Sequence, residues 1–464
     1  MKRILVGAAL VGTAMSAQAA DLPAKKAPYY KAPAALVYDW TGFYIGVNAG
    51  IGLGRDRSIL NAPATFNSTY LSPQGGLGGG QIGYNWQTDS LVGPLVLGVE
   101  ADIQGTGMSD GGTSLPIAGG VRYDQKLDWF GTVRGRVGTV HGPVLSYVTA
   151  GYAYGSVNTS VTEFGVPAFS SGSRMQSGWT VGSGVEAALG GNWTGKIEYL
   201  YLDLGKKTDS FTAFAVPQTF STEVRENIFR VGLNYRIGGN STYAPVVTAN
   251  WTGFYLGGNL GSGTGRDRSS FVGSGANEFF NLAPDGVNGG VQAGYNWQAA
   301  NWVFGLETDF QGSSQKDDKT CIISCTTLQA MAYDATLPWF GTVRGRLGYS
   351  LGSTLFYVTG GYAYGDVKTK ITGSFFGTTQ VNSLSSTKGG WTAGGGIETP
   401  FTLLGLFGPN WTTKTEYLYV DLGSTSTPVF GGAIPAAVST THVTEHIFRT
   451  GLNYHFNSPV VAKY

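Results

Sequence analysis

Apolar and polar side chains alternate with a period of two along most of this chain. Residues 129–138 read WFGTVRGRVG, which places Val133 and Val137 on one face and Arg134 and Arg136 on the other. Strict alternation predicts a β-strand with one apolar and one polar face. In a soluble sheet the apolar face would cover a core. In a small membrane barrel it would face lipid, and the arginines would point into the lumen and need carboxylate partners.

The same strand returns at residues 339–348, which read WFGTVRGRLG. Other segments recur in the same order: WTGFY at 40–44 and 251–255, GYNWQ at 83–87 and 294–298, EYLY at 198–201 and 416–419, and FRVGLNY at 229–235 with FRTGLNY at 448–454. The spacing between copies stays between 207 and 219 residues. The chain is therefore a tandem duplication, which sets its architecture.

Each copy contains eight strand candidates of about 10 residues, the length that a tilted strand needs to cross a bilayer. In the first copy they lie near residues 43–54, 77–87, 95–104, 129–138, 144–155, 178–187, 193–202 and 227–237. Short turns alternate with polar connections of roughly 20 residues, as in outer-membrane barrels. The pattern predicts an all-β protein of two tandem eight-stranded antiparallel transmembrane β-barrels, with one 16-stranded barrel as the alternative.

The polar face of the strands carries equal numbers of acids and bases in each copy. We expect these residues to form a paired charge network that fills the lumen, because an eight-stranded barrel is just wide enough to be filled by side chains. The first copy supplies Glu100, Asp102, Glu186 and Glu198 with Arg134, Arg136, Lys196 and Arg230. The second supplies Glu307, Asp309, Glu398 and Glu416 with Arg344, Arg346, Lys414 and Arg449.

The remaining segments have simpler assignments. Residues 1–20 combine a basic start, an apolar run and small residues before a cleavage site, which predicts a signal peptide. We expect a flexible periplasmic lead-in at 21–37, the first barrel at 38–237, a linker at 238–250, the second barrel at 251–456 and a tail at 457–464.

Composition agrees with a barrel and gives little sign of chemistry. The chain has 73 Gly, 13% aromatic and 13% charged residues, and a net charge of +1, so nucleic acid is not expected as a partner. Cys321 and Cys325 are expected to form a disulfide after export, because a metal site would need more ligands nearby. We predict no cofactor and no enzyme activity, since none of the four histidines has a counterpart in the other copy and no nucleophile motif is present.

The repeated motifs at 39–44, 83–86, 129–138, 198–205 and 230–235 resemble the small outer-membrane β-barrel family of alphaproteobacteria, porin-like surface antigens related to the membrane domain of OmpA. The resemblance covers about nine tenths of the mature chain, once per copy, whereas the usual member is a single barrel. It implies a place in the outer membrane of a Gram-negative bacterium, with loops at the cell surface and a role in envelope integrity or surface contact.

Two functions follow from these patterns. The first is a structural, surface-presenting outer-membrane protein with two plugged barrels. The alternative is a porin that forms a water-filled channel for small solutes, which the 16-stranded arrangement would allow. The expected partners are outer-membrane lipid, lipopolysaccharide and the barrel-assembly machinery. The sequence does not identify the partner of the extracellular loops.

Overall fold

The computed structural model describes residues 38–62, 65–90, 93–114, 121–163, 165–238, 249–273, 276–320, 329–401, 407–432 and 434–457. Nearly all of these residues lie in antiparallel β-strands. In this part of the chain no helix is long and apolar enough to cross a membrane. The expected signal peptide, the lead-in, Cys321, Cys325 and most of the linker and tail lie outside the described residues.

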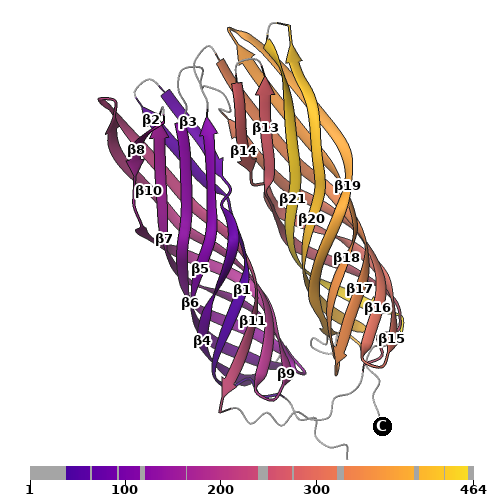
Figure 1. Cartoon of the computed structure of the whole chain (residues 1–464). Coiled ribbons are helices and arrows are strands. Elements are labelled where there is room, and N and C mark those ends of the chain that lie inside the picture. Colours follow the sequence, from indigo (N-terminus) through magenta and orange to yellow (C-terminus); the bar gives the residue numbers. More distant parts are fainter. Residues whose placement is uncertain are drawn as a thin grey trace, which may run out of the picture. The chain divides into compact units, whose positions relative to one another are not determined.

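The first repeat closes into a ring of eight strands (Figure 1). In ring order they are β1 (Gly42–Gly54), β4 (Gln74–Ser90), β5 (Gly93–Ser114), β6 (Val121–His141), β7 (Val144–Glu163), β9 (Arg174–Gly190), β10 (Trp193–Ala213) and β11 (Val216–Ile237). Strand β1 pairs with β4 on one side and with β11 on the other, so the ring has no free edge.

The second repeat forms a second ring in the same way. Its strands are β12 (Gly253–Gly265), β15 (Asp285–Ala299), β16 (Trp302–Thr320), β17 (Gln329–Leu351), β18 (Thr354–Phe375), β19 (Thr378–Pro400), β20 (Trp411–Gly431) and β21 (Ile434–His455). Strand β12 pairs with both β15 and β21. The chain thus has two eight-stranded barrels, and the 16-stranded alternative is wrong because each repeat pairs its own first and last strands.

The long connections contain more strand than the sequence predicts. Strands β10 and β11 stay paired beyond the predicted ends at 202 and 227, up to a turn at Phe214 and Ala215, both of which have positive φ. The first long connection folds into the hairpin β2 (Asp56–Ala62) and β3 (Thr65–Leu71), and β8 (Val166–Ser170) pairs with β7. In the second repeat β13 (Asp267–Gly273) and β14 (Ala276–Leu282) form the equivalent hairpin. These segments contain Thr, Val and Phe, which favour strands even where the strands leave the bilayer.

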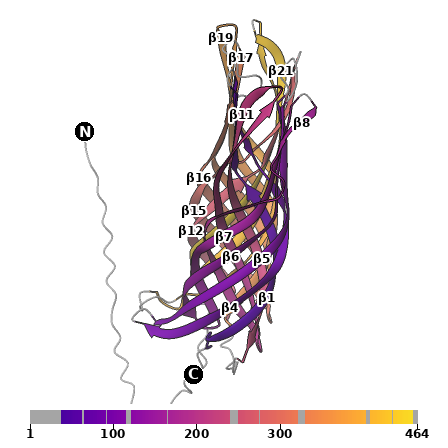
Figure 2. The ribbon, with the colours of Figure 1, turned by 90° about the vertical axis from the view of Figure 1, so that its left-hand side faces the viewer.

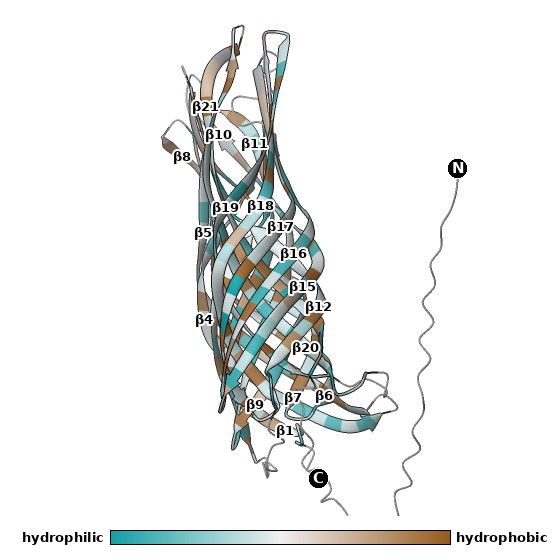
Figure 3. Ribbon diagram, turned by 90° about the vertical axis from the view of Figure 1, so that its right-hand side faces the viewer, coloured by the Kyte–Doolittle hydropathy of each residue, from teal (hydrophilic) through white to brown (hydrophobic). Residues whose placement is uncertain are grey.

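Alternation along the strands separates the two faces of each barrel wall. Val133 and Val137 are about half exposed on the outside. Arg134 and Arg136, which lie between these two valines in the sequence, are buried inside. The strands run obliquely to the barrel direction in Figure 2, as closure of a small barrel requires. Figure 3 shows hydrophobic and hydrophilic positions alternating along these strands. The residues on the inner face therefore determine what each lumen contains.

Candidate functional site in the barrel lumen

Arg134 lies at the centre of the first lumen. It is opposite Glu100 in the β5–β6 register, and its guanidinium contacts that carboxylate. Its Nη2 is also 2.9 Å from Asp102 Oδ2, and its Nη1 is 3.0 Å from Glu198 Oε1. One guanidinium thus pairs with three carboxylates from two strands, which uses its planar fork of donors fully.

Two further cations complete this cluster. Arg230 donates from Nε to Glu198 Oε2 at 2.7 Å and from Nη2 to Asp102 Oδ2 at 2.9 Å. Lys196 donates from Nζ to Glu100 Oε1 at 2.9 Å. Each of the three acids is therefore shared by at least two cations, as a buried charge cluster requires if it is to replace lost hydration.

Arg136 extends the network toward the end of the barrel with short turns, which we call the short-turn end. Its Nη1 is 2.9 Å from Glu186 Oε2, and its Nε donates to Asn85 Oδ1 at 2.8 Å. Its guanidinium carbon lies 4.7 Å from the centre of the Tyr44 ring. The opposite end, with the long connections, is called the long-loop end.

The second barrel repeats the ion pairs of this arrangement. Arg449 donates from Nη2 to Asp309 Oδ2 at 2.7 Å and from Nε to Glu416 Oε1 at 2.8 Å. The remaining pairs are Arg344 with Glu307, Asp309 and Glu416, Lys414 with Glu307, and Arg346 with Glu398. The structure therefore brings each set of eight predicted charges together in one lumen, and every one of the sixteen side chains is buried.

Phenols and amides that the sequence analysis did not assign also belong to the network. Tyr44 donates its hydroxyl to Glu100 Oε2 at 2.8 Å, and Tyr147 donates to Glu198 Oε1 at 2.9 Å. Asn234 Nδ2 donates to Glu186 Oε1 at 2.8 Å. Tyr44 and Asn234 occupy inward positions on β1 and β11, so extending the alternation to uncharged residues would have found them.

A tryptophan closes the short-turn end of each lumen. Trp40 precedes β1, is fully buried, and packs with Val96, Val140 and Leu145. Its backbone N–H donates to Gln87 Oε1 at 2.8 Å. In the second barrel Trp251 is buried in the same way and donates from its indole to Ser350 Oγ at 3.1 Å. We call these two buried residues, Trp40 and Trp251, the tryptophan stoppers. The sequence motif WTGFY thus supplies both the stopper and the start of the first strand of each barrel.

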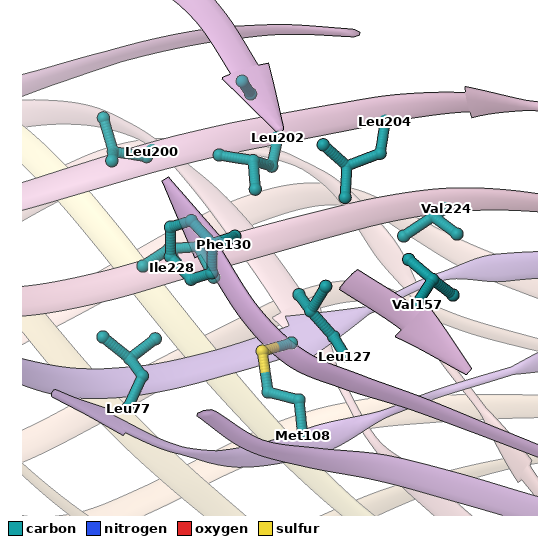
Figure 4. Packing of buried hydrophobic residues seen from close by; sticks show 11 residues of the cluster. Leu77, Met108, Leu127, Phe130, Val157, Leu200, Leu202, Leu204, Val224 and Ile228 are labelled. Carbon is teal, nitrogen blue, oxygen red and sulfur yellow. The ribbon is translucent and has the colours of Figure 1, made fainter. Parts of the chain in front are cut away.

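An apolar layer fills the lumen on the long-loop side of the charge network. In the first barrel its members point toward one another from several strands, as Figure 4 shows: Leu77, Met108, Leu127, Phe130, Val157, Leu200, Leu202, Leu204, Val224 and Ile228. An equivalent cluster around Phe340, Leu418 and Ile447 occupies the second barrel. Each lumen therefore contains three filled layers: a tryptophan stopper, a charge network and an apolar layer.

A buried pair of acids lies beside the apolar layer, beyond the segments expected to span the membrane. Asp56 accepts the backbone N–H of Arg225 at 2.7 Å and a hydrogen bond from Gln125. Glu226 is fully buried, and neither of its carboxylate oxygens has a hydrogen-bond partner in the described part of the chain. Burial raises the pKa of Glu226 well above its usual range, and the nearby Asp56 raises it further.

The second barrel contains the equivalent pair, Asp267 and Glu445. Burial raises the pKa of both carboxyls well above the usual values, and Gln315 donates a hydrogen bond to Glu445. The sequence analysis did not assign these acids, because it began the last strand of the first copy at residue 227, one position after Glu226. The raised pKa values favour neutral, protonated side chains in an otherwise apolar layer.

The histidines do not assemble a catalytic or metal site in the part of the chain that is described. His455 lies at the end of the second network, with Nε2 3.0 Å from Glu398 Oε1. His446 Nδ1 is 2.6 Å from the Tyr417 hydroxyl, and His442 Nε2 is 3.3 Å from Asp421 Oδ2. Among the described residues no group of three or more metal-binding side chains is arranged to hold an ion.

Comparison with known proteins gives the same division of the chain. The family model "Outer membrane protein beta-barrel domain" matches residues 7–236 and again 238–456. The "31 kDa outer-membrane immunogenic protein" of Brucella melitensis biotype 1 is 35% identical over 248 residues, which is 51% of this chain and 100% of that protein. The "22 kDa outer membrane protein" of Rhizobium leguminosarum bv. viciae is 33% identical over 214 residues, 44% of this chain and 82% of that protein. A relative of this length thus corresponds to about one repeat.

Proposed function

Because the chain belongs to the outer-membrane β-barrel domain family in both of its repeats, we propose that it is a structural and surface-presenting protein of the outer membrane. In this role two closed barrels anchor the chain and carry their long-loop ends at the cell surface. The proposed contribution is to envelope integrity. The surrounding partners would be outer-membrane lipid and lipopolysaccharide, and the barrel-assembly machinery would act on the chain during insertion.

The filling of both lumens is the observation that supports this role over a channel. A diffusing solute would have to displace Trp40, the network around Arg134 and the apolar layer around Phe130, all of which are buried. The network is balanced in each barrel and each of its charged residues has at least one ion-pair partner, so opening it would leave uncompensated charges in a narrow lumen. No catalytic role is proposed, and both relatives are named as outer-membrane proteins.

Planar-bilayer conductance of the refolded mature protein tests this proposal. We expect silence or faint flickering from the wild type, and more frequent openings from a variant that combines Arg134→Ala with Arg344→Ala. Large, stable, nanosiemens-scale steps from the wild type would overturn the proposal in favour of a porin. Folding of both proteins is checked first by the slower gel mobility that heating imposes on a folded barrel.

A cellular test addresses envelope integrity separately. A strain that lacks the gene should be more sensitive to detergent and to large antibiotics, and the wild-type gene should restore resistance. A variant with shortened long-loop segments but intact barrels should also restore it if the barrels themselves strengthen the envelope. Unchanged sensitivity in the deletion strain would contradict the proposed role.

A further inference from the structure

Strands β19 and β20 of the second barrel separate on the long-loop side of the charge network. They pair only from Trp391 with Asp421 to Pro400 with Thr412. Beyond that point β19 remains paired with β18 as far as Thr378, and β20 remains paired with β21. The two facing edges rejoin at the far end, where Gln380 Nε2 donates to the carbonyl of Gly431 at 3.2 Å. The wall of the second barrel therefore contains a side window.

A cavity of about 400 Å³ lies behind this window, within the size range of small-molecule sites. Side chains from β17 to β21 line it. Hydroxyl groups predominate among the polar ones: Thr369, Ser386, Thr425, Thr427, Ser439 and Thr441. Val367, Leu384 and Val443 supply apolar surface, and Lys388 is the one charged residue among the described side chains of the lining.

In the first barrel β9 and β10 also stop pairing at the equivalent point, Trp179 with Asp203, but side chains close the gap there. Arg174 of β9 forms an ion pair there with Asp209 of β10, and the rings of Phe169 and Phe211 stack with centroids 5.1 Å apart. Counting from the shared motifs Gly178-Trp179 and Gly390-Trp391, Arg174 corresponds to Ser386. Counting from Gly205 and Gly423, Asp209 corresponds to Thr427. At these two positions the second repeat thus has hydroxyl groups where the first has the ion pair of Arg174 with Asp209, which we call the clasp.

We propose that the cavity binds one acidic sugar unit. Serine and threonine hydroxyls both donate and accept hydrogen bonds, which suits the hydroxyl edge of a sugar ring. The apolar side chains suit its C–H face. Lys388 provides a cation for a carboxylate or phosphate group, and the described lining holds no carboxylate that would repel it.

The position of the window defines two sources for such a sugar. Trp391 and Tyr419 lie at its lower edge with ring centroids 5.1 Å apart. Paired aromatics at the end of spanning strands mark a membrane interface, so the window opens at the level of polar headgroups. The acidic sugar therefore belongs either to a glycolipid of the outer leaflet or to a soluble saccharide outside the cell.

Calorimetric titration of the refolded mature chain tests binding directly. The probe is the glucuronate-containing disaccharide of chondroitin, with lactose as the neutral match. We expect the acidic probe to bind and Lys388→Met to weaken its binding at least tenfold. Lys370→Met, which removes an exposed charge from the outer face of the neighbouring strand, should leave binding unchanged. The pair of substitutions Ser386→Arg and Thr427→Asp, which introduces the clasp of the first barrel, should abolish binding.

A second measurement separates the two sources. Acetylation of Lys388 is followed by mass spectrometry in nanodiscs with and without lipopolysaccharide. Slower acetylation with lipopolysaccharide identifies the glycolipid, whereas soluble-probe binding without that protection identifies a free saccharide. The proposal is overturned if the wild type shows neither effect, or if Lys388→Met binds the acidic probe as tightly as the wild type. Each variant is included only after the gel-mobility assay shows a folded barrel.

Discussion

Glu198 and Arg230 are direct partners in the β10–β11 register, and their side chains meet inside the lumen with Nε 2.7 Å from Oε2. Their counterparts Glu416 and Arg449 meet at 2.8 Å in the second barrel. Because a shift of β11 by one residue would turn Arg230 out of the lumen and leave Glu198 without it, this cross-strand pair also fixes the register of the closing strand.

Replacement of Arg230 by Ala should strongly destabilise the first barrel. The change leaves Glu198 and Asp102 buried with fewer cations, and breaking a buried pair in this way costs about 3–5 kcal/mol. The free energy of unfolding in urea, followed by tryptophan fluorescence, measures the effect. Arg122→Ala is the matched control, because Arg122 pairs with Asp124 on the exposed surface and should change stability by less than about 1 kcal/mol. Equal losses in the two variants would contradict the network.

Gly54→Ala should destabilise the barrel although it adds a single methyl group. A Cβ at this position would lie 2.6 Å from Glu226 Oε2 and 2.5 Å from Pro73 Cγ, so the acid pair and the adjoining loop would have to move. Overpacking of this kind costs about 1–3 kcal/mol. Gly135→Ala is the control, because its Cβ would meet nothing within 4 Å. A melting comparison in detergent should show a loss only for Gly54→Ala.

The buried acids predict a specific dependence of stability on pH. Burial and Asp56 raise the pKa of Glu226 in the folded barrel, so the folded state binds its proton more tightly than the unfolded chain does. The contribution of this group to stability is therefore present below the unfolded pKa, near 4.3, and falls as pH rises toward the folded pKa.

The double variant Glu226→Gln and Glu445→Gln should weaken this dependence. Each group contributes at most about 1.4 kcal/mol per pH unit. Urea midpoints measured from pH 4 to pH 8 should fall more steeply in the wild type than in the variant. Parallel curves would show that these carboxyls do not hold their protons in the folded barrels.

Trp40→Ala should weaken the first barrel without opening a pore. Loss of a fully buried tryptophan costs about 3–5 kcal/mol, yet the charge network and the apolar layer would still fill the lumen. Planar-bilayer recordings should stay silent while the unfolding midpoint falls. Stable conductance in Trp40→Ala would mean that the stopper alone closes the barrel.

Alternation along the strands was sufficient to predict the barrels and the residues of the central network. It works because a barrel wall alternates strictly between lumen and outside, so Arg134 and Val133 must face opposite ways. Alternation did not predict that Trp40 is buried in the lumen, because this residue lies before the first strand and resembles an interface aromatic. The alternation pattern also missed Glu226, because the polar residues around it are typical of a loop. In the structure these residues continue the pairing of β10 with β11.

The side window was beyond prediction for a different reason. β9 and β10 stop pairing at the equivalent point of the first barrel, so the window depends on which side chains face each other across the gap between the strands. The sequence difference that accompanies it, Arg174 and Asp209 against Ser386 and Thr427, acquires meaning only when the two positions are known to face each other. Side-chain pairs across such an edge are set by tertiary register, which local patterns do not encode.

Closure of each ring by its own first and last strands has a consequence for assembly. When β11 is in place, it has two nearly identical candidates for its free edge: β1, which begins GFYIG, and β12, which begins GFYLG and follows it directly in the chain. Pairing with β12 would join the repeats, whereas pairing with the much earlier β1 completes the first barrel. The duplicated chain therefore faces a kinetic choice between a near partner and a distant one during insertion. A single-barrel relative, with one copy of this strand, never has to make that choice.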